Sequence, residues 1–248
     1  MTQVTRGRAR IGVFVPFTNT NLEPDMMMLK PDGVSLHFAR LGGYDADEIP
    51  DEVQMAELGA SDMKEPLRLI QGVQPDVVMY GCTSATLAHG PIFDCDLREK
   101  ISVQIGAKTV TAAGALVHAL KHLGVTRIGF ASPYVPSLND EAIAFLAGEG
   151  FETVTRSEVS ETLGNLGQGA LSPDQVVELG LGADHTDVEA VVLSCTDMRS
   201  VEVIEQLEHA LGKPVVTSNQ AMMFQALNVA NLGPAQAGFG RLFERISL

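Results

Sequence analysis

The chain is poor in basic residues, with 17 Lys and Arg against 31 Asp and Glu and a formal net charge of −14. Proteins that bind nucleic acid neutralise phosphates with a positively charged surface. The composition therefore argues against nucleic acid as a partner. We expect a small-molecule ligand instead.

Long apolar runs are also missing. The first ten residues are basic, but they lead into an apolar strand of only about half a dozen residues, too short for a signal segment or a membrane span. We therefore predict a cytoplasmic protein that has no membrane as a partner.

Cysteine is rare as well, with three residues in the whole chain. An odd number in a chain without an export signal favours thiols over a disulfide framework. The cysteines have no close Cys/His spacing, and the histidines at positions 118, 122, 185 and 209 are scattered, so we predict no metal site. Neither a Gly-x-Gly-x-x-Gly turn after the first strand nor a Walker sequence is present, so a nucleotide signature is absent too.

What the chain does contain is an apolar stretch at residues 76–80 that runs into Gly81-Cys82-Thr83-Ser84. The unbroken apolar run is typical of a buried parallel strand, and Thr83 or Ser84 can cap a following helix. This places Cys82 at the carboxyl end of a strand and at the amino end of a helix. Ligands bind at that position in α/β sheets, and free backbone N–H groups stabilise a thiolate there.

The same pattern returns at residues 188–197, where a second apolar strand ends in Cys195-Thr196. Two more segment pairs match in the same order, 10–17 with 127–134 and 110–116 with 216–222. Three ordered matches predict two similar half-domains. If these face each other across a pseudo-twofold axis, Cys82 and Cys195 meet over one cleft.

Strands and helices alternate along the chain. We predict strands near 11–15, 34–40, 76–80, 108–111, 127–131, 153–156, 188–194 and 215–216, and helices near 55–69, 94–105, 112–123, 140–148, 173–180, 201–211 and 219–230. This alternation is typical of an α/β fold with parallel sheets. We place one half-domain at residues 1–112 together with 216–248, and the other at 113–215. The loop at 16–24 is rich in turn formers, and the Gly-rich loop at 158–172 is long enough to act as a lid or binding loop.

A single buried cysteine is usually structural, but two at equivalent positions of a repeat favour a catalytic pair. Cys95 has no counterpart in the second half, so we interpret it as a bystander. Polar side chains gather at the predicted strand ends, where they can cap helices or bind a carboxylate and stabilise charge on it: Thr18, Asn19, Thr83, Ser84, Tyr134 and Thr196.

Four motifs together resemble the aspartate/glutamate racemase superfamily, within it the branch of maleate cis–trans isomerases and arylmalonate decarboxylases. They are Gly81 to Ser84, Ser194 to Thr196, Pro16 to Thr20, and Ser132 to Tyr134. The resemblance covers nearly the whole chain. It implies two pseudo-symmetric Rossmann-like half-domains with the active site in the cleft between them, no cofactor, and a homodimer. It also implies that Asn19 and Tyr134 touch the substrate.

The predicted activity is cofactor-independent isomerisation of a small carboxylate, in the first place maleate to fumarate. Cys82 would add to the alkene and Cys195 would act as acid and base. The alternatives are an aspartate- or glutamate-type racemase, an arylmalonate-type decarboxylase, and a non-catalytic solute-binding protein. In the decarboxylases of this branch, as the resemblance implies, only the second of the two turns carries a cysteine. We expect Asn19, Thr83, Ser84, Tyr134, Thr196 and Asp197 to bind the substrate.

Asp197 bears on the choice between these activities. A carboxylate beside the cleft would repel a dicarboxylate but could hold the ammonium group of an amino acid. Arg199, two residues further on, could neutralise it.

Overall fold

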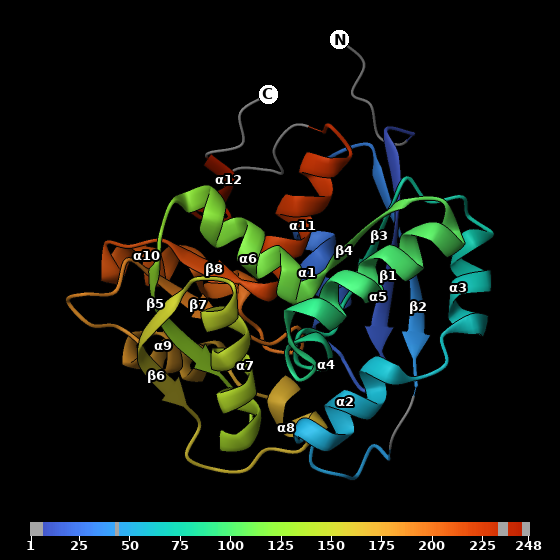
Figure 1. Cartoon of the computed structure of the whole chain (residues 1–248). Coiled ribbons are helices and arrows are strands. Elements are labelled where there is room, and N and C mark those ends of the chain that lie inside the picture. Colours follow the sequence, from blue (N-terminus) through green and yellow to red (C-terminus); the bar gives the residue numbers. More distant parts are fainter. Residues whose placement is uncertain (1–6, 43–44, 233–237, 245–248) are drawn as a thin grey trace.

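The computed structural model describes residues 7–42, 45–232 and 238–244 (Figure 1). The first six residues, used above in predicting the location, and parts of the C-terminal segment assigned to the first half-domain lie outside this range. The chain forms two four-stranded sheets in which all pairings are parallel. The predicted α/β fold with parallel sheets is confirmed.

The first sheet has the strand order β2-β1-β3-β4 and the second has the order β6-β5-β7-β8. The strands are β1 (Ala9–Pro16), β2 (Val34–Leu41), β3 (Val77–Tyr80), β4 (Lys108–Thr111), β5 (Arg127–Ser132), β6 (Glu152–Glu158), β7 (Ala190–Leu193) and β8 (Val215–Thr217). The three repeats predicted from the sequence fall on β1 and β5, β3 and β7, and β4 and β8. Each pair occupies the same place in its sheet, so both halves have the same topology. The exact division of the chain into half-domains stays a prediction.

Helices flank both sheets, and α6 packs against α11 between the two halves (Figure 1). The helices are α1 (Leu22–Leu29), α2 (Glu52–Ala60), α3 (Lys64–Gln71), α4 (Thr83–Leu87), α5 (Gly90–Ile105), α6 (Ala112–Leu123), α7 (Pro136–Gly148), α8 (Asn165–Gly169), α9 (Pro173–Gly182), the 3₁₀ turn η1 (Val201–Val203), α10 (Ile204–Leu211), α11 (Ser218–Val229) and α12 (Arg241–Glu244). The inner strands are fully apolar and buried; all four residues of β3 and all four of β7 are inaccessible to solvent.

The segment 16–24, predicted as a loop, contains the start of helix α1. Pro24 does not prevent this helix, because it lies in the first turn, where a backbone N–H has no helical partner to lose. The side chain of Asn19 takes up two of the free N–H groups at this end: its Oδ1 accepts from Asn21 N at 3.1 Å and Leu22 N at 2.9 Å. The strand end and the helix are therefore joined by a tight, hydrogen-bonded corner.

The single helix predicted at 55–69 is wrong, because the chain forms α2 and α3 there. The backbone of Ser61 is extended, and the carboxylate of Asp62 accepts from Lys64 N at 2.9 Å, which starts a new helix. Apolar periodicity continues through the break, so the pattern alone did not reveal it. The predicted loop at 158–172 likewise contains a short helix, α8.

Gly81 is required by space rather than by backbone conformation. A Cβ at this position would lie 2.3 Å from Leu22 Cδ2 and 2.6 Å from the carbonyl oxygen of Phe14. The glycine lets β3 pass directly beneath the start of α1, which brings the Cys82 turn close to the 16–22 corner.

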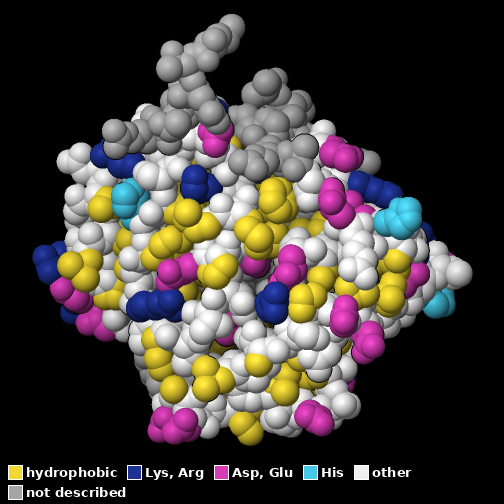
Figure 2. Space-filling model, turned by 180° about the vertical axis from the view of Figure 1, so that it is seen from behind, with side chains coloured by type: hydrophobic (Ala, Val, Ile, Leu, Met, Phe, Trp, Pro, Cys, Tyr) yellow, Lys and Arg dark blue, Asp and Glu magenta, His cyan; other side chains and the backbone are white. Residues whose placement is uncertain are grey.

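On the face seen in Figure 2, Lys and Arg side chains are interspersed among Asp and Glu side chains. The negative charge is therefore distributed over this face rather than concentrated at one place. Within the described residues, none of the helices has the length and apolar character needed to cross a bilayer.

Candidate active site

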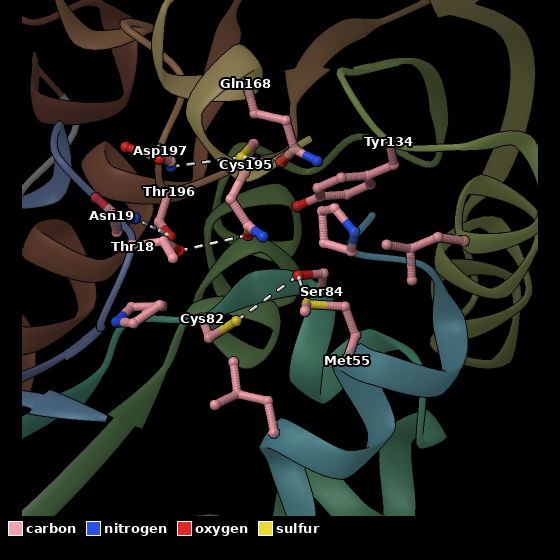
Figure 3. Close-up of a pocket in the computed structure, with 15 residues that line it drawn as sticks. Thr18, Asn19, Met55, Cys82, Ser84, Tyr134, Gln168, Cys195, Thr196 and Asp197 are labelled. Atoms are coloured by element: carbon pink, nitrogen blue, oxygen red, sulfur yellow. Dashed lines mark hydrogen bonds between the residues drawn. The ribbon is translucent and has the colours of Figure 1, made fainter. Parts of the chain in front are cut away.

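One small cavity lies where the carboxyl ends of the two sheets meet. It encloses about 40 Å³ and both Cys82 and Cys195 face it (Figure 3). The lining residues are Pro16, Thr18, Asn19, Pro50, Met55, Leu58, Cys82, Ser84, Tyr134, Leu138, Asn165, Gln168, Cys195, Thr196 and Asp197. They come from both sheets and from the loops between them. The structure thus brings the two cysteine turns together, as the repeat predicts.

Cys82 is the residue before helix α4, and its side chain is buried. Burial raises the pKa of this thiol, because a thiolate loses its hydration inside the protein. The N–H groups of Ala85 and Ser84 and the hydroxyl of Ser84 act in the opposite direction, since they donate to the sulfur. Ser84 Oγ donates to the sulfur of Met55 at 3.0 Å and lies 3.6 Å from Cys82 Sγ, where it can donate to the thiolate or accept from the thiol. The first thiol is surrounded mainly by donors.

Cys195 follows β7 and is equally buried. Burial raises the pKa of this thiol far above its ordinary value, and the negative charge of Asp197 raises it further. The N–H of Asp197 points at the sulfur from 3.4 Å and partly opposes this effect. The thiol donates to Gln168 Oε1 at 3.7 Å. The hydroxyl of Tyr134 also acts to lower this pKa. The carboxylate and the amide oxygen near the second thiol both favour its protonated form.

Asn19 and Thr196 join the two halves beside the thiols. Asn19 Nδ2 donates to Thr196 Oγ1 at 3.0 Å, and Thr196 Oγ1 donates to the carbonyl oxygen of Gly81 at 2.9 Å. This chain runs from the β1 corner through the second cysteine turn to the first. Both side chains reach the cavity wall, and both hold the two turns in a fixed relation.

Asp197 also reaches the wall, but its Oδ1 is already occupied. It accepts from the N–H groups of Thr20 at 2.7 Å and Asn21 at 3.0 Å, and from the side chains of both residues. The predicted neutralisation by Arg199 is wrong, because its guanidinium pairs with Glu202 at 2.6 Å. Asp197 fastens the second cysteine turn to the corner that follows β1.

Of the other residues predicted to bind the substrate, some line the cavity and one does not. Ser84 and Tyr134 line the cavity, whereas Thr83 is absent from its wall and donates to Ser218 Oγ at 2.9 Å. Burial raises the pKa of Tyr134 well above its ordinary value, against the side chains of Ser194 and Thr83, which lower it. Its hydroxyl makes no close hydrogen bond among the described residues. Cys95 is exposed and lies outside the cavity, in keeping with its interpretation as a bystander.

Sequence reasoning missed Asn165 and Gln168, which reach the cavity from α8. The length of the 158–172 segment indicated a binding loop, but no motif marked either residue. Missed too were Met55 and Leu58 of α2, which form an apolar part of the wall. The described residues contain no group of three or more His, Cys, Asp or Glu side chains placed to hold a metal ion.

Fold and site together define an α/β enzyme in which two repeated sheets each present a cysteine to a shared cavity. The sequence model of the arylmalonate decarboxylase family matches residues 11–243. The chain therefore belongs to the arylmalonate decarboxylase/maleate isomerase family, within the aspartate/glutamate racemase superfamily.

The relatives include proteins named as maleate isomerases and a protein named as an arylmalonate decarboxylase. The chain is 28% identical to a maleate isomerase of Nocardia farcinica, over 97% of this chain and 98% of the relative. It is 30% identical to an arylmalonate decarboxylase of Bordetella bronchiseptica, over 93% of this chain and 91% of the relative. A crystal structure of the Nocardia farcinica maleate cis–trans isomerase, a Cys-to-Ser mutant with a covalently bound succinylcysteine intermediate, superposes with a TM-score of 0.86. It is 25% identical and covers 96% of this chain and 99% of that one.

Proposed function

We propose that this protein is a maleate cis–trans isomerase that converts maleate to fumarate without a cofactor. The observation that carries the proposal is the placement of Cys82 and Cys195 on equivalent turns that line one cavity. Membership of the family and the succinylcysteine intermediate of the Nocardia relative support it.

In the first step, the Cys82 thiolate adds to one alkene carbon of maleate. A C–S bond forms, and the electron pair of the double bond moves into the carboxylate on the neighbouring carbon as an enediolate. Donors that already face the cavity, such as the hydroxyls of Tyr134 and Ser84, stabilise this charge.

In the second step, Cys195 donates its proton to the carbanionic carbon, which leaves a succinyl group on Cys82. The former double bond is now a single bond and rotates. Cys195, now a thiolate, removes the proton again, the C–S bond breaks, and fumarate leaves with the Cys82 thiolate restored. No atoms or electrons are gained or lost over the cycle.

The size of the cavity argues for a small substrate. A cavity that admits benzene has a volume of about 150 Å³, whereas this one encloses about 40 Å³. The wall must open for either ligand, and it must open further for an arylmalonate, which carries an aromatic ring. For the racemase alternative, Asp197 was the expected partner of an ammonium group, but its Oδ1 is engaged by Thr20 and Asn21.

Proton NMR of the protein in deuterated water tests the proposal, with maleate, aspartate, glutamate and an arylmalonate offered separately. We expect fumarate signals from maleate. Loss of the α-proton signal of an amino acid, or decarboxylation of the arylmalonate, without fumarate formation would refute it. The homodimer and the cytoplasmic location stay predictions; light scattering of the purified protein tests the first.

A further inference from the structure

Gln168 of α8 lines the cavity, and among the described residues only the oxygen of its side-chain amide has a hydrogen-bond partner. Its Oε1 accepts from Cys195 Sγ at 3.7 Å, while Nε2 has no hydrogen-bond partner among the described residues. The side chain is only 7% exposed, so water does not readily replace the missing partner. Figure 3 shows the amide between Cys195 and Tyr134, with its oxygen toward the sulfur.

An unpartnered buried donor is unfavourable, and this cavity has two. A buried polar group without a partner costs about 1–3 kcal/mol. The hydroxyl of Tyr134 is the second such donor, buried at the same wall. Because Oε1 points toward Cys195, Nε2 lies on the opposite side of the amide, toward Tyr134 (Figure 3). A ligand atom that satisfies Nε2 must accept hydrogen bonds and must lie on that side.

The amide is held in place because α8 is tied to the other half of the molecule at both ends. At its start, Asn165 Nδ2 donates to the carbonyl oxygens of Ala46 and Glu48, each at 3.2 Å. At its end, the carbonyl oxygen of Gly169 accepts from Asn21 Nδ2 at 2.9 Å. The position of Gln168 is thus set by contacts on either side of it.

We propose that Gln168 is a specificity-determining residue that selects short dicarboxylates over monocarboxylates. Nε2 donates to the substrate carboxylate that lies on the Tyr134 side of the amide, while Oε1 accepts from the Cys195 thiol. This inference rests on the proposed function, since it names the residue that reads the second carboxylate.

Binding of unreactive ligands tests the proposal apart from catalysis. Succinate supplies two carboxylates and propanoate one, and NMR titration measures Kd for each. A hydrogen bond to a charged group contributes enough that Gln168→Met, similar in volume but without amide, should weaken succinate binding by about 10- to 100-fold. Propanoate binding should change by less than about twofold. Leu166→Ala is the matched control on α8, because Leu166 is 74% exposed and absent from the cavity wall.

Gln168→Glu provides a second variant with the same shape. It keeps an acceptor for the Cys195 thiol, loses the donor and adds negative charge, so its loss for succinate should exceed that of Gln168→Met. Unchanged succinate binding in Gln168→Met, an equal loss for propanoate, or a wild-type protein that does not prefer succinate would each overturn the proposal. Failure of the proposed function has a different signature: no fumarate from maleate, while the Gln168-dependent preference for succinate persists.

Discussion

The two cysteine turns share the pair Cys-Thr after a buried strand and occupy the same place in their sheets, yet their surroundings differ. Around Cys82, backbone N–H groups and the hydroxyl of Ser84 oppose the effect of burial. Around Cys195, the negative charge of Asp197 adds to the effect of burial, and Gln168 accepts from the thiol. The repeat supplies two buried thiols, and their neighbours make Cys195 the weaker acid of the two.

This difference assigns the chemical roles. The thiol among donors ionises more readily and is the better nucleophile, whereas the thiol beside a carboxylate holds its proton and is the better acid. We infer that Cys82 adds to the substrate and that Cys195 manages the proton.

The largest effect is expected from removing either thiol. Cys82→Ala and Cys195→Ala should each lower kcat/KM for maleate by about 10³-fold or more, because one removes the nucleophile and the other the acid. Cys95→Ala serves as the control and should change it by less than about twofold. Intact-protein mass spectrometry after incubation with maleate should detect an adduct in Cys195→Ala and none in Cys82→Ala. An adduct in Cys82→Ala alone would reverse the roles.

The second prediction concerns Asp25, a buried carboxylate that Asn219 links to the Cys195 turn. Asn219 Nδ2 donates to Asp25 Oδ2 at 2.7 Å and to the carbonyl oxygen of Thr196 at 3.0 Å. Burial raises the pKa of Asp25 from 3.8 to about 7, against the hydrogen bond from Asn219; Glu202 and Asp197 raise it further, and Arg199 lowers it.

The pKa of Asp25 is higher in the folded state than in the unfolded state. Its contribution to the free energy of unfolding is therefore fully present below about pH 4 and is lost as the pH rises to about 7. The difference between 3.8 and about 7 corresponds to about 4 kcal/mol. Asp25→Asn removes the cost of ionisation and should raise Tm at pH 8 by about 5 °C or more, with little gain at pH 4. Thermal unfolding at both pH values measures this, with the exposed Asp140→Asn as control. An equal shift at both values would contradict the titration of Asp25.

The third prediction concerns Asp197, whose charge distinguishes the two turns. Asp197→Asn keeps an oxygen that can accept from Thr20 and Asn21 but removes the negative charge near Cys195. The pKa of Cys195 should fall, so the loss of kcat at high pH should begin at a lower pH than in the unchanged protein. A pH profile of kcat for maleate measures it. An unchanged profile would mean that Asp197 only fastens the loops.

The smallest effect is expected from Ser84, on the other turn. Ser84→Ala removes a donor to Cys82 and should shift the rise of kcat/KM with pH toward higher pH, lowering the value at pH 7 by about three- to tenfold. Thr83→Val removes the neighbouring hydroxyl as a control, because that hydroxyl donates to Ser218 and is not among the groups that lower the pKa of Cys82. Equal pH shifts in both variants would show that the hydroxyl of Ser84 has no particular effect on Cys82.

The sequence predicted the parts of the site that depend on local chain order. A buried strand followed by Cys and Thr defines its own turn, and the repeat brings Cys82 and Cys195 to the same edge. Gln168 was out of reach, because α8 is placed by contacts with the carbonyl oxygens of Ala46 and Glu48 far away in the chain. The role of Asp197 was missed for the same reason, since its partners are more than 170 positions distant.

The most direct test of the account is a pH titration of each thiol in the ligand-free protein. Alkylation with iodoacetamide at a series of pH values, read by peptide mass spectrometry, gives a midpoint for each cysteine. Cys82 and Cys195 are 4% and 5% exposed, so access through the cavity is similar and the midpoints report ionisation. We predict that Cys82 reacts at lower pH than Cys195, and that Asp197→Asn narrows the gap between the two midpoints. A midpoint for Cys195 at or below that of Cys82 would contradict it.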